Sequence, residues 1–136
     1  MSEDATTLSA RPRVVIADNH PAVIRELRGL LEPEFEVVGT VSDGYALVAM
    51  VEALRPDVVV SDVVLRLLDG VAAAQQIRRH HPGVKVVFAT VLTEPEVREH
   101  ALAAGAAAFV SMAAAGDELA PAVRAAIARQ AEPPTG

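Results

Sequence analysis

The sequence contains neither cysteine nor tryptophan, and aromatic residues make up only 3% of it. Without cysteine, the chain has no disulfide, no thiolate nucleophile and no cysteine-ligated zinc site. No apolar run approaches the roughly 20 residues that a helix needs to cross a bilayer. The acidic start of the chain, at Glu3 and Asp4, is unlike a secretory signal. We therefore expect a cytoplasmic protein with no membrane partner.

Acidic residues outnumber basic ones, 18 to 12, which gives a net charge of −6, and no block of like charge stands out. A protein that grips nucleic acid needs a clustered basic face, so this chain is not expected to bind DNA by itself. Hydrophobic residues form 51% of the 136 residues, enough for one domain with an aliphatic core. Since valine favours strands and alanine favours helices, their abundance indicates an α/β protein.

Five short apolar runs alternate with amphipathic segments. The runs predict strands at 14–17, 36–40, 58–61, 85–90 and 107–110. Most are continuously apolar, which is typical of parallel strands covered on both faces. The segments between them carry apolar residues at helical spacing. These stripes are Val23, Leu27, Leu30 and Leu31; Leu47, Met50, Val51 and Leu54; Val71, Ala74 and Ile77; Val97, Ala101 and Leu102; and Leu119, Val123 and Ile127.

Local signals place the ends of these helices. Pro21 fits a first helical position, and Asp43 is expected to cap the second helix. Thr93 and Glu96 have the spacing of a capping box for the fourth helix, which Gly105 should end.

Five strand–helix units in succession predict a parallel sheet with right-handed crossovers. The expected fold class is α/β, a doubly wound flavodoxin-like (βα)5 fold whose five strands have the order 2-1-3-4-5. We assign residues 13–130 to one domain, 1–12 to a disordered tail and 131–136 to a linker or C-terminal tail. The last helix should start near Asp117, because Pro121 falls early in it.

Polar residues follow the central strands, where ligands of such sheets bind. Asp18 follows the first strand and Asp62 the third, and Thr90 ends the fourth. Converging carboxylates repel each other unless a cation such as Mg²⁺ lies between them. A metal-braced aspartate is a nucleophile towards phosphorus, and a nearby hydroxyl can bind the phosphoryl oxygens. Burying Asp62 is costly without a partner, which favours a functional role. For the other residues a structural role competes with a functional one. Asp18 fits a helix cap as well as it fits a functional site, and Thr90 taken alone could be an ordinary strand residue. His20 fits a local cap or packing role better than that of a ligand or base.

Five segments carry a resemblance to a known family. They are residues 14–21, 55–62, 69–70, 86–90 and 104–109. In order and spacing the chain resembles the receiver domain of response regulators, particularly the NarL/FixJ-like branch, from about residue 13 to 129. The resemblance implies two-component signalling, with transcriptional control as the output.

The resemblance also implies roles for individual residues. Asp62 would accept a phosphoryl group from a histidine kinase. Mg²⁺ would be held by the pair Asp18 and Asn19, by Asp62 and by the backbone carbonyl of Val64.

A second set of implied roles concerns the response to phosphorylation. Thr90 and Phe109 would form the switch pair, in which the hydroxyl moves towards the phosphoryl group and the ring turns inward. The face made by the fourth helix, fifth strand and fifth helix would then form a homodimer. DNA would be bound only by a possible separate C-terminal domain.

The sequence departs from the family pattern at four places. Asn19 stands where an aspartate is usual, so Mg²⁺ should bind more weakly, and Met112 replaces the usual lysine. The only lysine, Lys85, begins the fourth strand at the opposite edge and cannot substitute. Arg66, the nearest cation, replaces a proline and is expected to be a solvated loop residue. The loop at 63–68 is unusually apolar and could cover the site or contact a partner.

These departures leave several functions open. The leading hypothesis is a receiver with weakened phosphorylation at Asp62, and not an enzyme. One alternative is a pseudo-receiver that dimerises or binds a partner without phosphorylation. A flavodoxin-like cofactor carrier would need a phosphate-binding loop after the first strand, where Asp18 would repel phosphate. An enzyme with a His20–Asp62 acid/base pair is the least favoured, because no substrate pocket or oxyanion donor can be identified.

Overall fold

The computed structural model describes residues 11–130. The predicted tails therefore lie outside the described residues, except for Arg11 and Pro12. The strands are β1 (Arg13–Ala17), β2 (Glu36–Val41), β3 (Val58–Ser61), β4 (Lys85–Thr90) and β5 (Ala108–Ser111). The helices are α2 (Pro21–Leu31), α3 (Gly44–Leu54), α4 (Gly70–His80), α5 (Pro95–Ala103) and α6 (Ala115–Gln130), with a short 3₁₀ turn η1 (Met112–Ala114) before α6.

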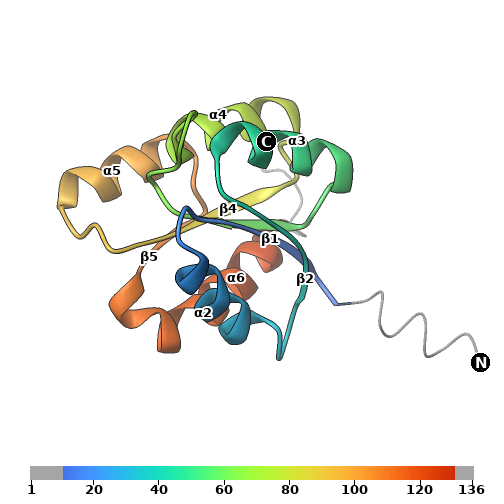
Figure 1. The fold of residues 1–136 in the computed structure, drawn as a ribbon, viewed down its shortest axis with the longest axis vertical. Helices are drawn as coiled ribbons and strands as arrows, with labels where there is room; N and C mark the ends of the chain where they lie inside the picture. Colours follow the sequence, from blue (N-terminus) through green and yellow to red (C-terminus); the bar gives the residue numbers. More distant parts are fainter. Residues whose placement is uncertain (1–10, 131–136) are drawn as a thin grey trace, which may run out of the picture.

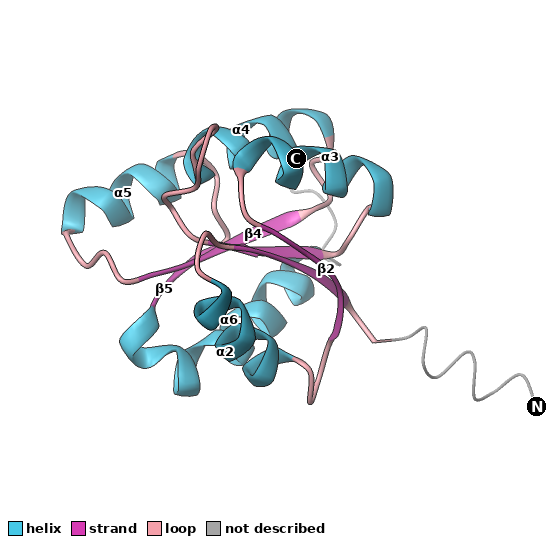
Figure 2. Cartoon of the chain, viewed as in Figure 1, coloured by secondary structure: helices cyan, strands magenta, loops and turns pink. Residues whose placement is uncertain are grey.

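The five strands form one parallel sheet in the order β2-β1-β3-β4-β5. Helices α3, α4 and α5 cover one face of the sheet, and α2 and α6 cover the other (Figure 1). Figure 2 shows the resulting three layers, with the strands in magenta between two layers of helices in cyan. The order of strands reverses between β1 and β3, which lie next to each other. The predicted flavodoxin-like fold class is confirmed.

Successive strand residues point to opposite faces, so each strand contributes to two apolar cores. Val15 and Val59 pack on the side of α3 and α4, whereas Ile16 and Val60 pack on the side of α2 and α6. All four side chains are fully buried. This explains why the strands read as continuous apolar runs, and it makes the inner strands a rigid base for the residues at their ends.

Two predicted helix starts are confirmed and one is wrong. Pro21 is the first residue of α2, and the Asp43 carboxylate accepts a hydrogen bond from the Ala46 N–H, at 2.7 Å, as the cap of α3. The capping box of the α5 start is not formed. Helix α5 begins at Pro95, its N-cap is Glu94, and that residue makes no side-chain cap hydrogen bond. Proline at the first helical position has no N–H to cap, so the helix starts later than Thr93 requires.

The structure also tests the predicted end of α5, its buried face and the predicted start of α6. Gly105 adopts a left-handed φ of 104° just beyond α5, as expected of a helix terminator. Leu102, assigned to the buried stripe of α5, is 38% exposed, and Ala104 is buried in its place. Helix α6 begins at Ala115, two residues before Asp117, because the Ser111 hydroxyl caps the preceding turn by accepting from the Ala113 N–H.

Within residues 11–130, no helix is both long enough and apolar enough to span a membrane.

Candidate functional site

The predicted site residues meet at the carboxyl edge of the sheet. Asp18 directly follows β1 and Asp62 directly follows β3, and these two strands are paired to their last residues. The Asp62 N–H donates to the Ala17 carbonyl at 2.9 Å, which fixes the start of the loop after β3. Thr90 is the last residue of β4, on the other side of β3, and is 1% exposed. The sheet order therefore brings both carboxylates and the hydroxyl to one place.

These residues line a cleft of about 250 Å³. Its lining consists of Asp18, His20, Val23, Asp62, Thr90, Val91 and Met112. The described residues that line the cleft include no lysine and no arginine. The cleft thus joins two acidic side chains to an apolar wall.

Asp62 has an unusual electrostatic environment. Burial raises the pKa of its carboxyl group above the ordinary value, and the nearby Asp18 carboxylate raises it further. Hydrogen bonds from the Thr90 hydroxyl and from the backbone N–H groups of Val64 and Val63 oppose these two effects and lower the pKa. The Asp62 Oδ1 atom is buried and has no hydrogen-bond partner within the described part of the chain. A buried carboxylate oxygen without a donor is costly, so this atom can accept a cation or a donor from a ligand.

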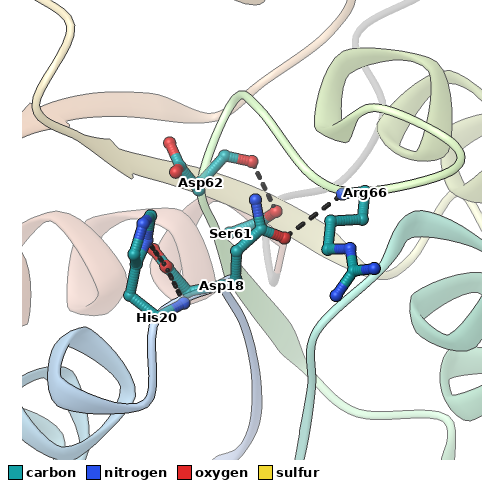
Figure 3. Close-up of polar contacts among 6 residues, drawn as sticks. Asp18, His20, Ser61, Asp62 and Arg66 are labelled. Carbon is teal, nitrogen blue, oxygen red and sulfur yellow. Dashed lines mark hydrogen bonds and ion pairs between the residues drawn. The ribbon is translucent and has the colours of Figure 1, made fainter.

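Asp18 is buried and is held by the residue two positions later. Its Oδ1 atom accepts a hydrogen bond from the His20 N–H at 2.8 Å and lies 3.0 Å from the His20 Nδ1 atom (Figure 3). His20, not Asp18, is the N-cap residue of α2, and the His20 side chain is 69% exposed. His20 stands at the cap position, but its side chain makes no cap hydrogen bond. The contact is with Asp18, not with Asp62 as an acid/base pair would need.

Asn19 makes a contact that the sequence did not suggest. Its Oδ1 atom accepts a hydrogen bond from the Arg66 N–H at 3.2 Å, which Figure 3 draws as the dashed line that ends at Arg66. The Arg66 carbonyl accepts in turn from the Gly44 N–H at 3.1 Å, at the start of α3. The loop after β3 is therefore fastened to both the β1–α2 loop and α3 through the backbone of one residue.

The Arg66 side chain takes no part in the cleft. It is exposed, and Figure 3 shows its guanidinium group directed away from Asp62. The prediction of a solvated loop residue is confirmed. Lys85 begins β4, at the other end of that strand from Thr90, which confirms the predicted distance from the site.

The apolar loop after Asp62 divides its residues between the core and the surface. Val63 and Leu65 are 8% and 5% exposed, whereas Val64 and Leu67 are 51% and 78% exposed. Leu67 also has a left-handed φ of 69°, which is uncommon for a residue other than glycine. Val91, which is 73% exposed after β4, is the exposed apolar residue that lines the cleft itself.

Phe109 and Met112 lie on the fifth strand and just after it. Phe109 is paired with Phe88 across β4 and β5 and is partly buried. The Arg98 guanidinium lies 5.8 Å from the centre of its ring. Met112 begins η1 and lines the cleft beside Asp62 and Thr90, so an uncharged thioether occupies this wall.

The residues present meet the minimum requirement of a magnesium site. Asp18 and Asp62 supply two carboxylates, and the buried Asp62 Oδ1 atom is unpaired. Mg²⁺ keeps several waters and needs only one or two carboxylates from a protein. Among residues 11–130 no three histidine, cysteine or acidic side chains converge as a metal site. The site thus offers the two carboxylates that Mg²⁺ needs and no third acidic side chain among the described residues.

Comparison with known proteins identifies the family. The model of the response regulator receiver domain matches residues 14–124. The transcriptional regulatory protein LiaR of Bacillus subtilis is 34% identical over 116 residues, which are 84% of this chain and 55% of LiaR. A protein-glutamate methylesterase/protein-glutamine glutaminase of Anaeromyxobacter dehalogenans is 39% identical over 99 residues, which are 71% of this chain and 29% of that protein.

Solved structures agree with the sequence relatives. The signal receiver domain of the putative response regulator NarL from Mycobacterium tuberculosis superposes with a TM-score of 0.77 at 27% identity, covering 88% of this chain and 96% of that one. The chain spans about half or less of the two curated relatives named above, and in both it matches only part of a longer protein. The match over residues 14–124 and the shared fold show that the chain belongs to the response regulator receiver domain family, in its NarL/FixJ-like branch.

Proposed function

We propose that this chain is the receiver of a two-component transcriptional regulator and that Asp62 accepts a phosphoryl group from a histidine kinase. One observation carries the proposal: Asp62 is a strand-end carboxylate with a buried, unpaired oxygen, beside Asp18 and Thr90. The relative LiaR is a transcriptional regulatory protein, which supports the output. Residues 131–136 would then link the receiver to a separate domain that binds DNA.

In the proposed reaction, an Asp62 carboxylate oxygen attacks the phosphorus of a phosphohistidine. The bond between phosphorus and the imidazole nitrogen breaks, the kinase histidine leaves, and an acyl phosphate forms on Asp62. Asp18, Asn19, Asp62 and the Val64 carbonyl would hold Mg²⁺, which offsets the negative charge that collects at the phosphoryl group when it is bound.

The hydroxyl of Thr90 would donate to a phosphoryl oxygen after transfer. It is buried at the end of β4 and lines the cleft with Asp62, and Phe109 lies on the neighbouring strand β5, two residues before the partner of Thr90. The face formed by α5, β5 and α6 would respond by forming a homodimer.

Phosphorylation is expected to be weak for two reasons. Met112 offers no positive charge to the phosphoryl group, and Asn19 is neutral and already bonded to Arg66. Loss of one buried charge-assisted contact costs about 2–4 kcal/mol of transition-state stabilisation, which slows transfer by roughly 30- to 900-fold.

A second candidate function is a pseudo-receiver that works without phosphorylation. The hydrogen bond between Asn19 and the Arg66 N–H favours it, because this bond joins the two loops of the site through protein atoms alone. Such a receiver would keep one conformation of the α5–β5–α6 face and bind a partner or a second copy constitutively.

The test is to add Mg²⁺ with acetyl phosphate or beryllofluoride and to follow intact mass and amide NMR shifts. An adduct on the protein that is absent from the Asp62→Asn variant, with shifts around Thr90, supports the phosphorylation proposal. No adduct and no shift would favour the pseudo-receiver. The reversions Met112→Lys and Asn19→Asp should together raise the rate of phosphorylation, and no increase would contradict the explanation of the impairment.

A further inference from the structure

Another hollow of the molecule lies between α4 and α5 and shares no residue with the cleft at Asp62. Its volume is about 460 Å³, within the range of about 300–1,000 Å³ typical of small-molecule sites. The described lining contains no acidic side chain. It consists of Gln75, Arg78 and Arg79 of α4 and of Ala103 and Ala104 at the end of α5.

The polar residues of this hollow lie on one face of α4. Gln75 precedes Arg78 by three residues and Arg79 by four, which is the spacing of neighbours on a helix surface. Each guanidinium group presents a planar fork of N–H donors, and the Gln75 amide adds further donors beside them. The alanine side chains of the other wall supply neither charge nor acceptors. The side chains of the hollow therefore offer an excess of donors and of positive charge.

Arg78 and Arg79 also differ from most other arginines, because neither has an acceptor within residues 11–130. Arg124, for example, pairs with Glu34 at 2.6 Å. The other arginines that donate to a carboxylate or a backbone carbonyl are Arg11, Arg13, Arg28, Arg55, Arg98 and Arg129. Two neighbouring arginines without an acceptor in one hollow are thus a feature of this place in the fold.

Closure of the helix ends does not account for these arginines. At the end of α4, the Ile77 carbonyl accepts from the His81 N–H at 2.6 Å. At the end of α5, the carbonyls of residues 100–102 accept from backbone N–H groups that follow them. The charge of Arg78 and Arg79 complements the dipole of α4, but their N–H donors stay available to a ligand.

The Arg78 side chain packs on Gly105, just beyond α5. Gly105 has a φ of 104°, and a Cβ atom there would lie 2.6 Å from the Arg78 Cδ atom and would also collide with Nη1. The Arg78 side chain therefore lies directly over the glycine backbone, which limits its rotamers. A donor that is positioned before binding loses less entropy when a ligand orders it.

These donors favour one class of ligand. A cation would meet two guanidinium groups, which repel it. A carboxylate has two oxygens in one plane and matches a single fork. A phosphate group carries about two negative charges at neutral pH, and its several oxygens point in different directions, so it can engage both guanidinium groups. The volume of the hollow leaves room for an organic part against Ala103 and Ala104.

We propose that the hollow between α4 and α5 binds the phosphate group of a small molecule, as an ester or as the free ion. The guanidinium groups of Arg78 and Arg79 and the Gln75 amide donate to its oxygens. The site lies apart from Asp62, so the proposal holds whether or not Asp62 is phosphorylated.

NMR of the full chain, isotope-labelled at nitrogen, provides the test, in the absence of Mg²⁺ and of any phosphodonor. β-Glycerophosphate is titrated into the protein while the arginine Nε–H signals and the backbone amides are followed. The expected result is a saturable shift of the Arg78 and Arg79 Nε–H signals and of the Ala104 amide. Arg25 is the internal control, because it is exposed on α2, in the other helix layer, and its signal should stay unchanged.

Sodium phosphate and sodium acetate at equal ionic strength identify the part of the ligand that is recognised. Acetate should bind at least about fivefold more weakly than β-glycerophosphate, because it has less charge and fewer oxygens. Tighter binding of the ester than of inorganic phosphate would identify an ester site, and equal binding a site for the free ion; both support the proposal. Shifts that do not saturate, or equal affinity for acetate, would overturn it.

Variants test the two guanidinium groups. Arg78→Gln and Arg79→Gln should each weaken β-glycerophosphate binding by about three- to tenfold, and the double variant should abolish the saturable shift of the Ala104 amide. Arg78→Lys keeps the charge without the fork and should weaken binding less than Arg78→Gln does.

Arg25→Gln is the matched control, because it removes the same charge from the other layer and should leave the affinity unchanged. Unchanged affinity in the double variant, or an equal loss in Arg25→Gln, would refute the site. The substituted side chains are exposed, so the variants are expected to fold. If one of them loses the dispersed spectrum of a folded protein, the comparison of phosphate with acetate in the natural chain still decides the question.

Discussion

Replacing Asp62 by asparagine should stabilise the protein at neutral pH. The native Asp62 carboxylate is partly buried, faces Asp18 and has one oxygen without a donor. Asparagine has nearly the same shape and no charge, so it removes the repulsion and the desolvation of an ion. Removing the charge of this partly buried carboxylate should contribute about 1–2 kcal/mol, which raises Tm by roughly 3–10 °C in a domain of this size.

The pH dependence provides a stricter check on the same reasoning. Because folding raises the pKa of Asp62, the folded state holds this proton more tightly than the unfolded state does. The contribution of Asp62 to stability therefore falls as pH rises from the unfolded pKa through the folded pKa, and it is constant above that window. The advantage of Asp62→Asn should be full near pH 7 and should shrink as the pH is lowered towards about 4.

The assay is urea unfolding followed by circular dichroism at several pH values, for both proteins. Asp43→Asn is a matched control, because asparagine caps a helix as well as aspartate does and the change in stability should stay within about 0.5 kcal/mol. An Asp62→Asn variant no more stable than the natural chain at neutral pH, or an advantage that grows in acid, would refute this account of the site.

Three further substitutions test the fold and the loops around the site. Gly44→Ala should destabilise the protein by about 2 kcal/mol or more, measured by urea unfolding, because a Cβ atom there would collide with the Leu68 carbonyl. Phe88→Ala should cost about 3–5 kcal/mol in the same measurement, since this fully buried ring is lost from the core; a cost below about 1 kcal/mol would contradict the packing. Asn19→Ala should speed hydrogen exchange at the Arg66 amide, which loses its acceptor, with little change in global stability.

Much of the fold follows from the sequence because its strands are buried on both faces. Continuous apolar runs such as 58–61 locate the inner strands, and strand-end positions then follow from the topology. For the same reason the convergence of Asp18, Asp62 and Thr90 could be predicted, since neighbouring parallel strands end at one edge.

The parts that escaped prediction depend on tertiary placement. Pro95 competes with the Thr93 capping signal, and local spacing alone does not decide which residue opens the helix. Whether Leu102 or Ala104 faces the core depends on how α5 lies against the sheet.

The lining of the cleft shows the same limit. Val23 lies in a helix and Val91 in a loop, and each reaches the cleft only because of how its segment packs. The acceptor of the Arg66 N–H likewise lies in a different loop, at Asn19. The hydrophobic periodicity of one segment carries no information on its contacts with other segments.

The hydrogen bond from the Arg66 backbone to Asn19 links two departures from the family pattern that look independent in the sequence. A proline at position 66 would have no N–H to donate, so the side chain of residue 19 would be released. An aspartate at position 19 would still meet this N–H as long as Arg66 is present. If Mg²⁺ binds as proposed, the backbone of Arg66 would compete with it for one side-chain oxygen, and recovery of full Mg²⁺ affinity should need Asn19→Asp together with Arg66→Pro.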